Sequence, residues 1–372
     1  MFDEQIDRAA TQSSRWRGKD VLALTVGDTD FRIAGPIRQA LEQRLAHGVL
    51  GYDSLPDAVY ERFIARAGER YGWQVQRSWM TPLPGVVQAL NLVCRAVTGP
   101  GQSIITETPV YYPFLDAPAN AGRERRDLQA LDSGSSWDFD LQGLESLCRQ
   151  PDTRLLLLCH PQNPLGRVFD RELLAAIADI CAANDVVICS DEIHCDLLFD
   201  GARHVPMASV SEAAAAITVT LVAPTKAFSI SGLGGSFAIM SNPDLQARFR
   251  EMSAGIVPGL NVFTQVAMQA AWEACDNWLA EQLIYLQENR DYLVRALGEL
   301  GIGCYRPGAT YFLWLDFRTS GLNDPWQDLV DGGVELSDGA RFGQAGFLRL
   351  NFASPRSLLE EAVNRIAAKL SA

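Results

Sequence analysis

Short apolar runs alternate with amphipathic segments through the middle of the chain. The apolar runs have the length of buried strands, whereas the segments between them repeat apolar residues at helical spacing. Strands are predicted at residues 103–106, 155–159, 186–189, 217–222 and 237–240. This alternation predicts an α/β fold, in which helices cover both faces of a mostly parallel sheet.

Helical patterns continue toward both ends of the chain. Amphipathic helices are predicted at residues 35–46, 57–71, 86–97, 172–183 and 357–370. Residues 262–300 form one long helical stretch without proline, which predicts two helices or one bent helix.

The end of the chain has a different pattern. Past Gly301, β-like segments at 311–317 and 347–352 precede the last helix, which predicts a smaller α+β module. We therefore expect two domains. The large one comprises residues 41–267, and the small one comprises residues 1–40 and 268–372.

Composition narrows the class of protein. Of the 372 residues, 48% are hydrophobic and 21% are charged, as in ordinary globular proteins. The net charge of −13 argues against nucleic-acid and anionic-membrane partners. No apolar run reaches the ~20 residues of a membrane span. The N-terminus lacks the pattern of a signal peptide, and the eight cysteines form no CxxC pair, so we expect a cytoplasmic protein without a metal site.

Lysine usage points to the chemistry. Only three of the 32 basic residues are lysines: Lys19, Lys226 and Lys369. The first and last are expected on the surface, whereas Lys226 lies between two apolar runs. A buried lysine can lose its proton and condense with a carbonyl, which arginine cannot do. The alternative is a surface lysine with a packed stem. The small residues around Lys226 favour a Schiff-base lysine.

Three polar clusters follow predicted strands, at residues 160–163, at 191–194 and around Lys226. Ligands of parallel sheets bind at the carboxyl ends of strands, so the clusters are expected to converge. A Schiff-base lysine suits a class I aldolase, a decarboxylase or a pyridoxal 5′-phosphate (PLP) enzyme. Asp191 favours PLP, because a carboxylate keeps a pyridine nitrogen protonated. From its spacing alone, Asp191 could equally be a helix-capping or turn residue.

Two glycine-containing segments bear on phosphate binding. Gly85 precedes the helix predicted at 86–97, and an open helix N-terminus suits a phosphate group. Glycines 232, 234 and 235 lack the GxGxxG spacing and do not follow a first strand, so a dinucleotide loop is rejected.

Motifs along the whole chain carry a family resemblance. They are, in order, Gly85, Tyr111, Asn163-Pro164-x-Gly166, Asp191-x-x-His194, Lys226 and Arg349. With these motifs the chain resembles fold-type I PLP enzymes of the aminotransferase class I/II superfamily, and within them the MalY/PatB-type cystathionine β-lyases. The resemblance implies a large domain with a mostly parallel seven-stranded sheet between helices, and a smaller α+β domain.

The resemblance also implies roles for single residues. The cofactor-binding set would be Tyr52, Gly85, Val86, Tyr111, Asn163, Asp191, His194, Thr225 and Lys226, and the substrate-binding set Asp28, Thr29 and Arg349. Lys226 would hold PLP and move protons, and Arg349 would bind the substrate α-carboxylate. Tyr52 would reach the phosphate of the neighbouring subunit, which implies a homodimer with a shared active site.

Departures from the family pattern concern the reaction and the substrate. Many aminotransferases carry a phosphate-binding arginine eight residues after the lysine, where this chain has Gly234. The lyase branch commonly lacks that arginine. Leu165 and Thr29 replace a threonine and a methionine that are usual in the family. Thr29 is expected near the substrate entrance.

The resemblance therefore implies a C–S β-lyase that converts cystathionine or cysteine S-conjugates into a thiol, pyruvate and ammonia. It also implies a role in methionine biosynthesis. Two alternatives remain: a PLP-dependent α-amino acid aminotransferase, which uses the same cofactor residues, and a non-catalytic regulator on the same fold.

Overall fold

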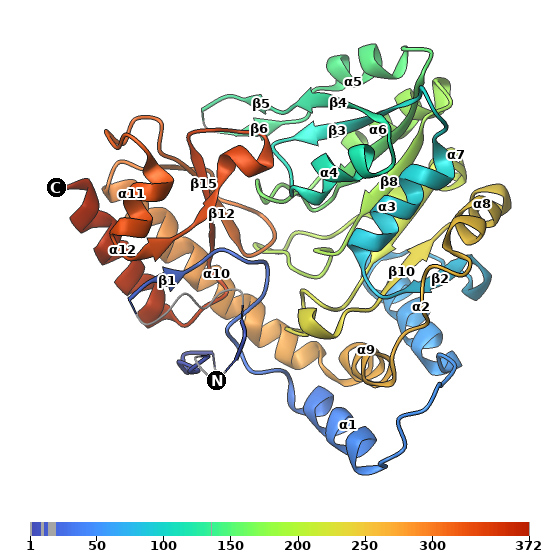
Figure 1. Cartoon of the computed structure of the whole chain (residues 1–372), viewed down its shortest axis with the longest axis horizontal. Helices are drawn as coiled ribbons and strands as arrows, with labels where there is room; N and C mark the ends of the chain where they lie inside the picture. Colours follow the sequence, from blue (N-terminus) through green and yellow to red (C-terminus); the bar gives the residue numbers. More distant parts are fainter. Residues whose placement is uncertain (1, 9–10, 14–19, 135, 372) are drawn as a thin grey trace.

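The computed structural model describes residues 2–8, 11–13, 20–134 and 136–371. Lys19 lies outside the described residues, so its expected surface position has no structural counterpart. Figure 1 shows a large sheet flanked by helices and, beside it, a smaller sheet built from the C-terminal part of the chain.

The large sheet has seven strands in the order β2-β10-β9-β8-β7-β3-β4. These strands are β2 (Met80–Leu83), β10 (Ser236–Ile239), β9 (Thr218–Val222), β8 (Val187–Asp191), β7 (Thr153–Cys159), β3 (Ser103–Thr108) and β4 (Glu124–Gln129). Neighbouring pairs from β9 to β4 are parallel, whereas β10 is antiparallel to both β9 and β2. The prediction of a mostly parallel α/β sheet is confirmed.

The two edge strands, β2 and β4, were not predicted. Pro82 lies inside β2, and a proline is tolerated in a sheet mainly at an edge, where its missing N–H costs no ladder bond. β4 is charged and largely exposed. Both strands therefore lack the continuous apolar pattern that identifies the central ones.

Helices pack on both faces of this sheet. Those of the large part are α1 (Gly35–Ala46), α2 (Asp57–Tyr71), α3 (Val86–Val97), α4 (Pro113–Asn120), α5 (Leu141–Cys148), α6 (Arg171–Ala183), α7 (Glu212–Ile217), α8 (Pro243–Ser253) and α9 (Val262–Ala274), whereas α10 (Asp276–Glu299), α11 (Pro325–Asp331) and α12 (Arg356–Leu370) belong to the C-terminal part. Leu155 and Leu157 of β7 pack with α3, α4 and α8, whereas Leu156 and Leu158 pack with α5 and α6. The alternation arises because successive strand residues point to opposite faces.

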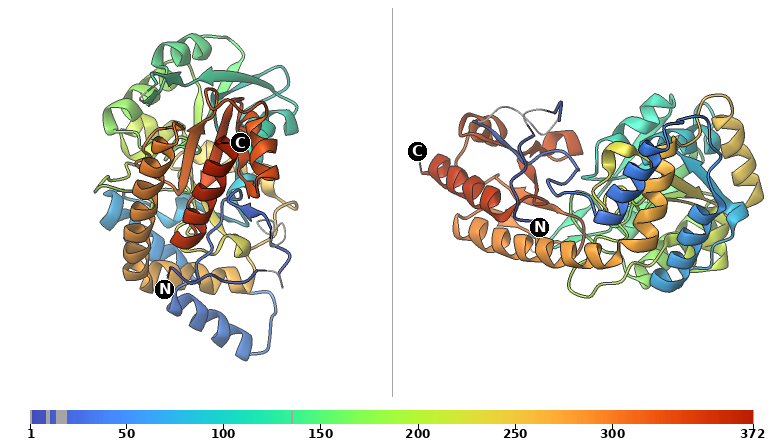
Figure 2. Two further views of the ribbon diagram at one scale, coloured as in Figure 1. Left: turned by 90° about the vertical axis from the view of Figure 1, so that its left-hand side faces the viewer. Right: turned by 90° about the horizontal axis from the view of Figure 1, so that it is seen from below.

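The long helical stretch predicted at 262–300 is two helices, α9 and α10, which are separated at Cys275. Next comes a four-stranded sheet with the order β11-β12-β15-β14. Its strands are β11 (Gly303–Cys304), β12 (Phe312–Asp316), β14 (Ser337–Asp338) and β15 (Phe347–Asn351). Figure 2 shows α10 running alongside α12 and this sheet. The α+β character of the C-terminal part matches the pattern of the sequence, while the domain limits at 41–267 stay a prediction.

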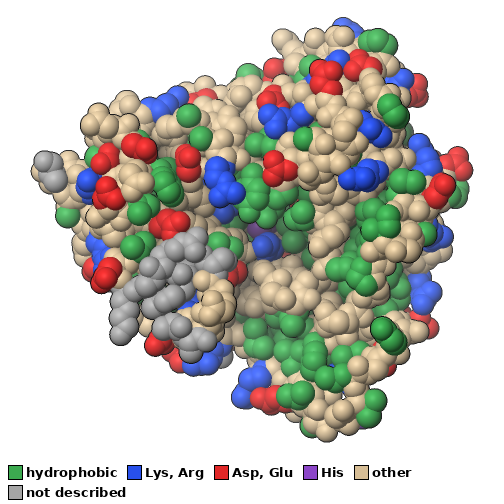
Figure 3. Space-filling model, viewed as in Figure 1, with side chains coloured by type: hydrophobic (Ala, Val, Ile, Leu, Met, Phe, Trp, Pro, Cys, Tyr) green, Lys and Arg blue, Asp and Glu red, His purple; other side chains and the backbone are tan. Residues whose placement is uncertain are grey.

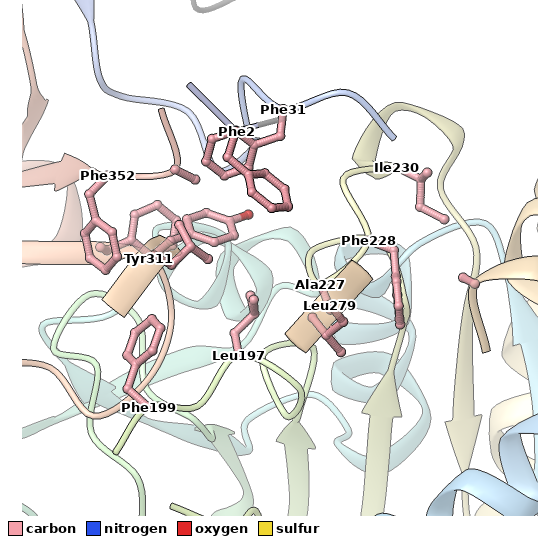
Figure 4. Packing of buried hydrophobic residues seen from close by; sticks show 14 of the residues in the cluster. Phe2, Phe31, Leu197, Phe199, Ala227, Phe228, Ile230, Leu279, Tyr311 and Phe352 are labelled. Carbon is pink, nitrogen blue, oxygen red and sulfur yellow. The ribbon is translucent and has the colours of Figure 1, made fainter. Parts of the chain in front are cut away.

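The N-terminal segment joins this C-terminal part. Strand β1 (Leu22–Ala23) pairs in parallel with β13 (Val334–Glu335). Figure 4 shows Phe2 and Phe31 packed near Tyr311 and Phe352, with the loop that carries Ala227 and Phe228 in the same cluster. The Asn351 amide donates to the carbonyls of Val26 (2.5 Å) and Asp28 (2.8 Å). These contacts tie the 25–28 loop to β15, and Lys226 contacts the same loop at the Gly27 carbonyl. Residues 223–235, which carry Lys226, are called the lysine loop.

Two small hairpin strands, β5 (Leu131–Asp132) and β6 (Trp137–Asp138), complete the sheets. Within the described residues, no helix is long and apolar enough to cross a membrane. The same part of the chain contains no group of three or more histidine, cysteine or acidic side chains arranged to hold a metal ion.

Candidate active site

A cavity of about 780 Å³ lies at the carboxyl ends of the central strands. Its wall includes residues from each of the three polar clusters: Asn163 after β7, Asp191 and His194 at and after β8, and Lys226 after β9. Figure 3 shows a hollow on this face with basic and histidine side chains inside it. The topology thus brings the three clusters into one site, because parallel strands end at the same edge of the sheet.

Lys226 lines this cavity, is partly buried and donates a hydrogen bond from Nζ to the Gly27 carbonyl. Burial lowers the pKa of the Lys226 amine to about 8, and the positive charge of Arg349 acts in the same direction. The carboxylates of Asp28 and Asp191 oppose that shift. A larger fraction of this amine is therefore neutral near physiological pH than for an exposed lysine, as condensation with a carbonyl requires.

Asp191 ends β8 with its side chain buried in the cavity. Burial raises the pKa of this carboxyl to about 7, against the opposing effects of the Ile193 N–H and of Lys226. The Ile193 N–H donates to Oδ1 over 3.1 Å. A cationic ring nitrogen placed against this carboxyl would favour its ionised form.

Arg349 lies on β15 and is 3% exposed. It donates from Nη1 to Asn163 Oδ1 (3.0 Å) and from Nη2 to the Thr25 carbonyl (2.8 Å). The guanidinium lies over the rings of Phe312 (3.9 Å) and Phe342 (4.7 Å). Because its plane is held by these contacts, the guanidinium is preorganised to bind a carboxylate at the cavity wall.

The N-terminus of α3 also forms part of the cavity wall. Gly85 and Val86 line it, and no side chain caps this helix, so its first N–H groups are available to an anion. Thr225 and Ser231 line the same cavity. A phosphate-bearing pyridine fits this set of wall residues, which combines an open helix terminus, a partly buried amine and a buried carboxyl.

Gly234 also lines the cavity, and its backbone conformation is unusual. Its φ of +69° and ψ of −157° lie in a region open essentially to glycine alone, and an added Cβ would lie 2.4 Å from the Pro84 carbonyl. The Gly235 N–H donates to that same carbonyl over 2.6 Å. An arginine at position 234 therefore has no room in this loop geometry.

Tyr111 and His194 complete the predicted cofactor neighbours in the wall. The Tyr111 N–H donates to the Asn163 carbonyl over 3.0 Å, which links the two loops. Burial raises the pKa of the Tyr111 phenol. Burial lowers the pKa of His194 to about 3, with Lys226 and Arg349 adding to the effect, so the imidazole is neutral.

Three predicted residues are not part of the cavity wall. Tyr52 is fully exposed and lies at a separate surface depression. The Asp28 carboxylate pairs with Arg8 at 3.0 Å and acts on Lys226 only as a nearby charge. The Thr29 hydroxyl is buried and donates to Ser229 Oγ over 2.6 Å. Within the single chain, Thr29 thus contacts the loop that follows Lys226, while its expected place near the substrate entrance stays a prediction.

The structure adds wall residues that the sequence reasoning missed. The Arg349 guanidinium lies over the rings of Phe312 and Phe342. The Gly27 carbonyl accepts a hydrogen bond from Lys226, and the cavity wall also contains Arg341 and Asp338. No local pattern distinguishes a ring that packs on an arginine from an ordinary core phenylalanine.

Comparisons with known proteins agree over the full chain. Residues 19–366 match the family model described as aminotransferase class I and II. The chain is 35% identical to cystathionine beta-lyase PatB of Bacillus subtilis (strain 168), and the alignment covers 100% of both. Among solved structures, OvoB aligns with 40% identity and a TM-score of 0.97 over 100% of this chain and 99% of that one. Cystalysin from Treponema denticola, which contains PLP, aligns with 29% identity and a TM-score of 0.96 over 100% and 98%.

Proposed function

Because the chain belongs to the aminotransferase class I and II family, we propose that it is a PLP-dependent C–S β-lyase. The observation that carries this proposal is one cavity whose wall contains a partly buried Lys226, a buried Asp191 and a buried, oriented Arg349. Similarity over the whole chain to a cystathionine β-lyase selects the reaction within the family.

PLP, when bound, supplies an electron sink for the negative charge that develops at the substrate Cα. Lys226 would hold its aldehyde carbon, and Asp191 would keep its ring nitrogen protonated. Gly85 and Val86 would bind its phosphate through backbone N–H groups, with Thr225 adding a hydroxyl. Asn163 and His194 would lie beside its phenolic oxygen, and Tyr111 would cover the ring face.

The residues of the chain then divide the reaction between them. Arg349 binds the α-carboxylate and fixes the amino acid with its Cα–H toward Lys226. Once the substrate amino group has displaced it, the Lys226 amine would be free to take the Cα proton as a general base; the electron pair then forms a Cα–Cβ double bond as the Cβ–S bond breaks. The sulfur leaves as a thiolate and is protonated to the thiol. The remaining aminoacrylate takes up water and gives pyruvate and ammonia.

Gly234 supports elimination over amino transfer. The resemblance associates an arginine at this position with many aminotransferases, and the loop geometry leaves no room for a side chain there. A regulator without catalysis would not need the buried carboxyl of Asp191 beside the partly buried Lys226, because burying an ionisable group costs solvation free energy.

A homodimer is part of the same proposal. Tyr52 lies away from the cavity of its own subunit and is fully exposed, as a residue donated to a neighbouring site would be. Mixing the inactive variants Tyr52→Ala and Lys226→Ala tests this. Activity should recover to about a quarter of the wild-type level, because half of the dimers are hybrids and each holds one intact site. No recovery, with hybrid dimers verified, refutes a shared site.

All eight cysteines are free thiols, which supports a reducing compartment such as the cytoplasm. With cystathionine as substrate, the released thiol would be homocysteine, which supports a role in methionine biosynthesis.

The proposed function is tested with purified protein loaded with PLP and supplied with L-cystathionine. Pyruvate and free thiol should appear in equal amounts, and Lys226→Ala should abolish both. Amino transfer that depends on a 2-oxo acid, without thiol release, would identify an aminotransferase. If neither reaction occurs although PLP is bound, the result would favour the non-catalytic alternative.

A further inference from the structure

A second arginine lines the cavity, and the reaction as described does not use it. Arg341 belongs to the short 3-10 helix η4 (Gly339–Phe342) and is exposed at its outer side. Its guanidinium lies over the Tyr112 ring at 4.8 Å, and Tyr112 also lines the cavity. Within residues 20–134 and 136–371, Arg341 makes no ion pair, so its charge is not neutralised there by a neighbouring carboxylate.

The backbone that carries Arg341 is held in place. An added Cβ at Gly339 would lie 2.3 Å from the Phe347 carbonyl, so η4 packs directly on β15. The Asp338 carboxylate accepts from the Ala340 N–H over 3.0 Å and caps η4. The Val110 N–H donates to the Phe342 carbonyl over 3.0 Å, which ties η4 to the segment that carries Tyr112.

Arg341 is adjacent in the chain to a residue that contacts Arg349. The next residue, Phe342, is one of the two rings that contact the Arg349 guanidinium. Two guanidinium groups therefore lie on one wall of the cavity: a buried one suited to the α-carboxylate, and an exposed one toward solvent. The Cβ substituent of a bound amino acid extends away from its α-carboxylate, and the open side of the cavity is where a long substituent has room.

We propose that Arg341 binds a carboxylate on the leaving group and so selects cysteine S-conjugates whose thiol part is an acid. This inference rests on the proposed function, because a leaving group exists only if the protein is a lyase. Arg341 is a binding residue in it, not a catalytic one. Glu335 and Asp338 line the same wall. They add negative charge, so an ammonium group beside the distal carboxylate is compatible with the site.

The test uses two nearly isosteric substrates, S-(2-carboxyethyl)-L-cysteine and the corresponding amide. Their leaving thiols are similar, and only the distal charge differs. Arg341→Gln should raise KM for the acid about tenfold, with kcat within about twofold, and should change KM for the amide less than about twofold, because a charge-assisted contact is lost only with the acid. The wild-type preference for the acid should fall as salt is raised, since an exposed contact is screened.

Arg318→Gln is the matched control. Arg318 is also exposed and lies over a ring, that of Phe347 at 4.5 Å, but it does not line the cavity. The Arg318→Gln variant should leave KM and kcat for both substrates unchanged. Equal effects of Arg341→Gln on acid and amide, or no effect on either, would overturn the proposal.

A binding measurement separates this proposal from the lyase assignment. L-2-Aminopimelate has the acid's chain length but no sulfur to eliminate, and L-2-aminoheptanoate replaces its distal carboxylate with a methyl group. In calorimetry with the PLP-loaded protein, Arg341→Gln should weaken binding of aminopimelate about tenfold and leave aminoheptanoate unchanged. This result supports the Arg341 site even if no thiol is released. Unchanged aminopimelate binding overturns it even if the lyase reaction is confirmed.

Discussion

Replacing Gly234 with alanine is expected to damage both the stability of the lysine loop and the binding of PLP. The backbone at this position has φ +69° and ψ −157°, and a Cβ would lie 2.4 Å from the Pro84 carbonyl. An L-residue in such a conformation costs about 1–3 kcal/mol before the steric contact is counted. At about 2 °C per kcal/mol for a chain of this size, Tm should fall by roughly 2–6 °C.

The effect on the cofactor follows from the position of Pro84. Its carbonyl accepts the Gly235 N–H at 2.6 Å, and the next residue, Gly85, precedes α3. Relief of the contact must therefore move either the lysine loop or the helix terminus that would bind phosphate. Losing one such hydrogen bond to a charged group weakens PLP binding by about tenfold or more.

Gly232→Ala is the matched control for this prediction. Gly232 lies in the same loop, but its added Cβ would have no atom within 4 Å, and its φ is not in the left-handed region. Thermal unfolding and an equilibrium PLP titration of both variants provide the measurement. Equal Tm values and equal PLP affinities for the two variants would refute the argument that Gly234 is required by its backbone geometry.

Three further predictions concern the same cavity. The rate at which PLP adds to the cofactor-free protein should rise with pH and level off above about pH 8, because only the neutral Lys226 amine reacts and its pKa is lowered to about 8; a stopped-flow rate still climbing through pH 10 would contradict this. Arg349→Gln should raise KM for any amino-acid substrate roughly 10- to 100-fold, because the charged hydrogen bonds to the α-carboxylate are lost. A fall in kcat with KM unchanged would contradict a role in binding the α-carboxylate. Gly234→Arg should lower Tm at least as much as Gly234→Ala and should not yield 2-oxo acid-dependent amino transfer, which a coupled assay would detect.

The elements that could be predicted are those with a strong local pattern. The strand at 155–159 lies within β7, and the helix at 57–71 has the bounds of α2. Apolar continuity identifies the buried strand, and the left-handed Gly72 ends the helix. Helix α4 was missed because Pro118 lies inside it, and the edge strands were missed because they are exposed or contain proline.

Part of the candidate site was predictable because several of its residues directly follow predicted strands. Asn163, Asp191 and Lys226 each follow a strand of the same sheet, so their meeting is a consequence of parallel strands. The pairing of Arg349 with Asn163 was not predictable from spacing, because 186 residues separate them in the chain. The contact of Thr29 with Ser229 was not predictable either, because 200 residues separate them in the chain.

The α/β class, the central strands and the place of Lys226 between two apolar runs could be inferred from the sequence alone, because each is a pattern within a few neighbouring residues. Only the tertiary structure decided what surrounds that lysine. The shifted pKa of Lys226, the aromatic pair around Arg349, the room denied to a side chain at Gly234 and the place of Arg341 in the cavity wall all depend on desolvation and close contact between segments far apart in the chain. Such contacts have no local signature, since burial and charge proximity exist only once the sheet and the C-terminal part have packed together.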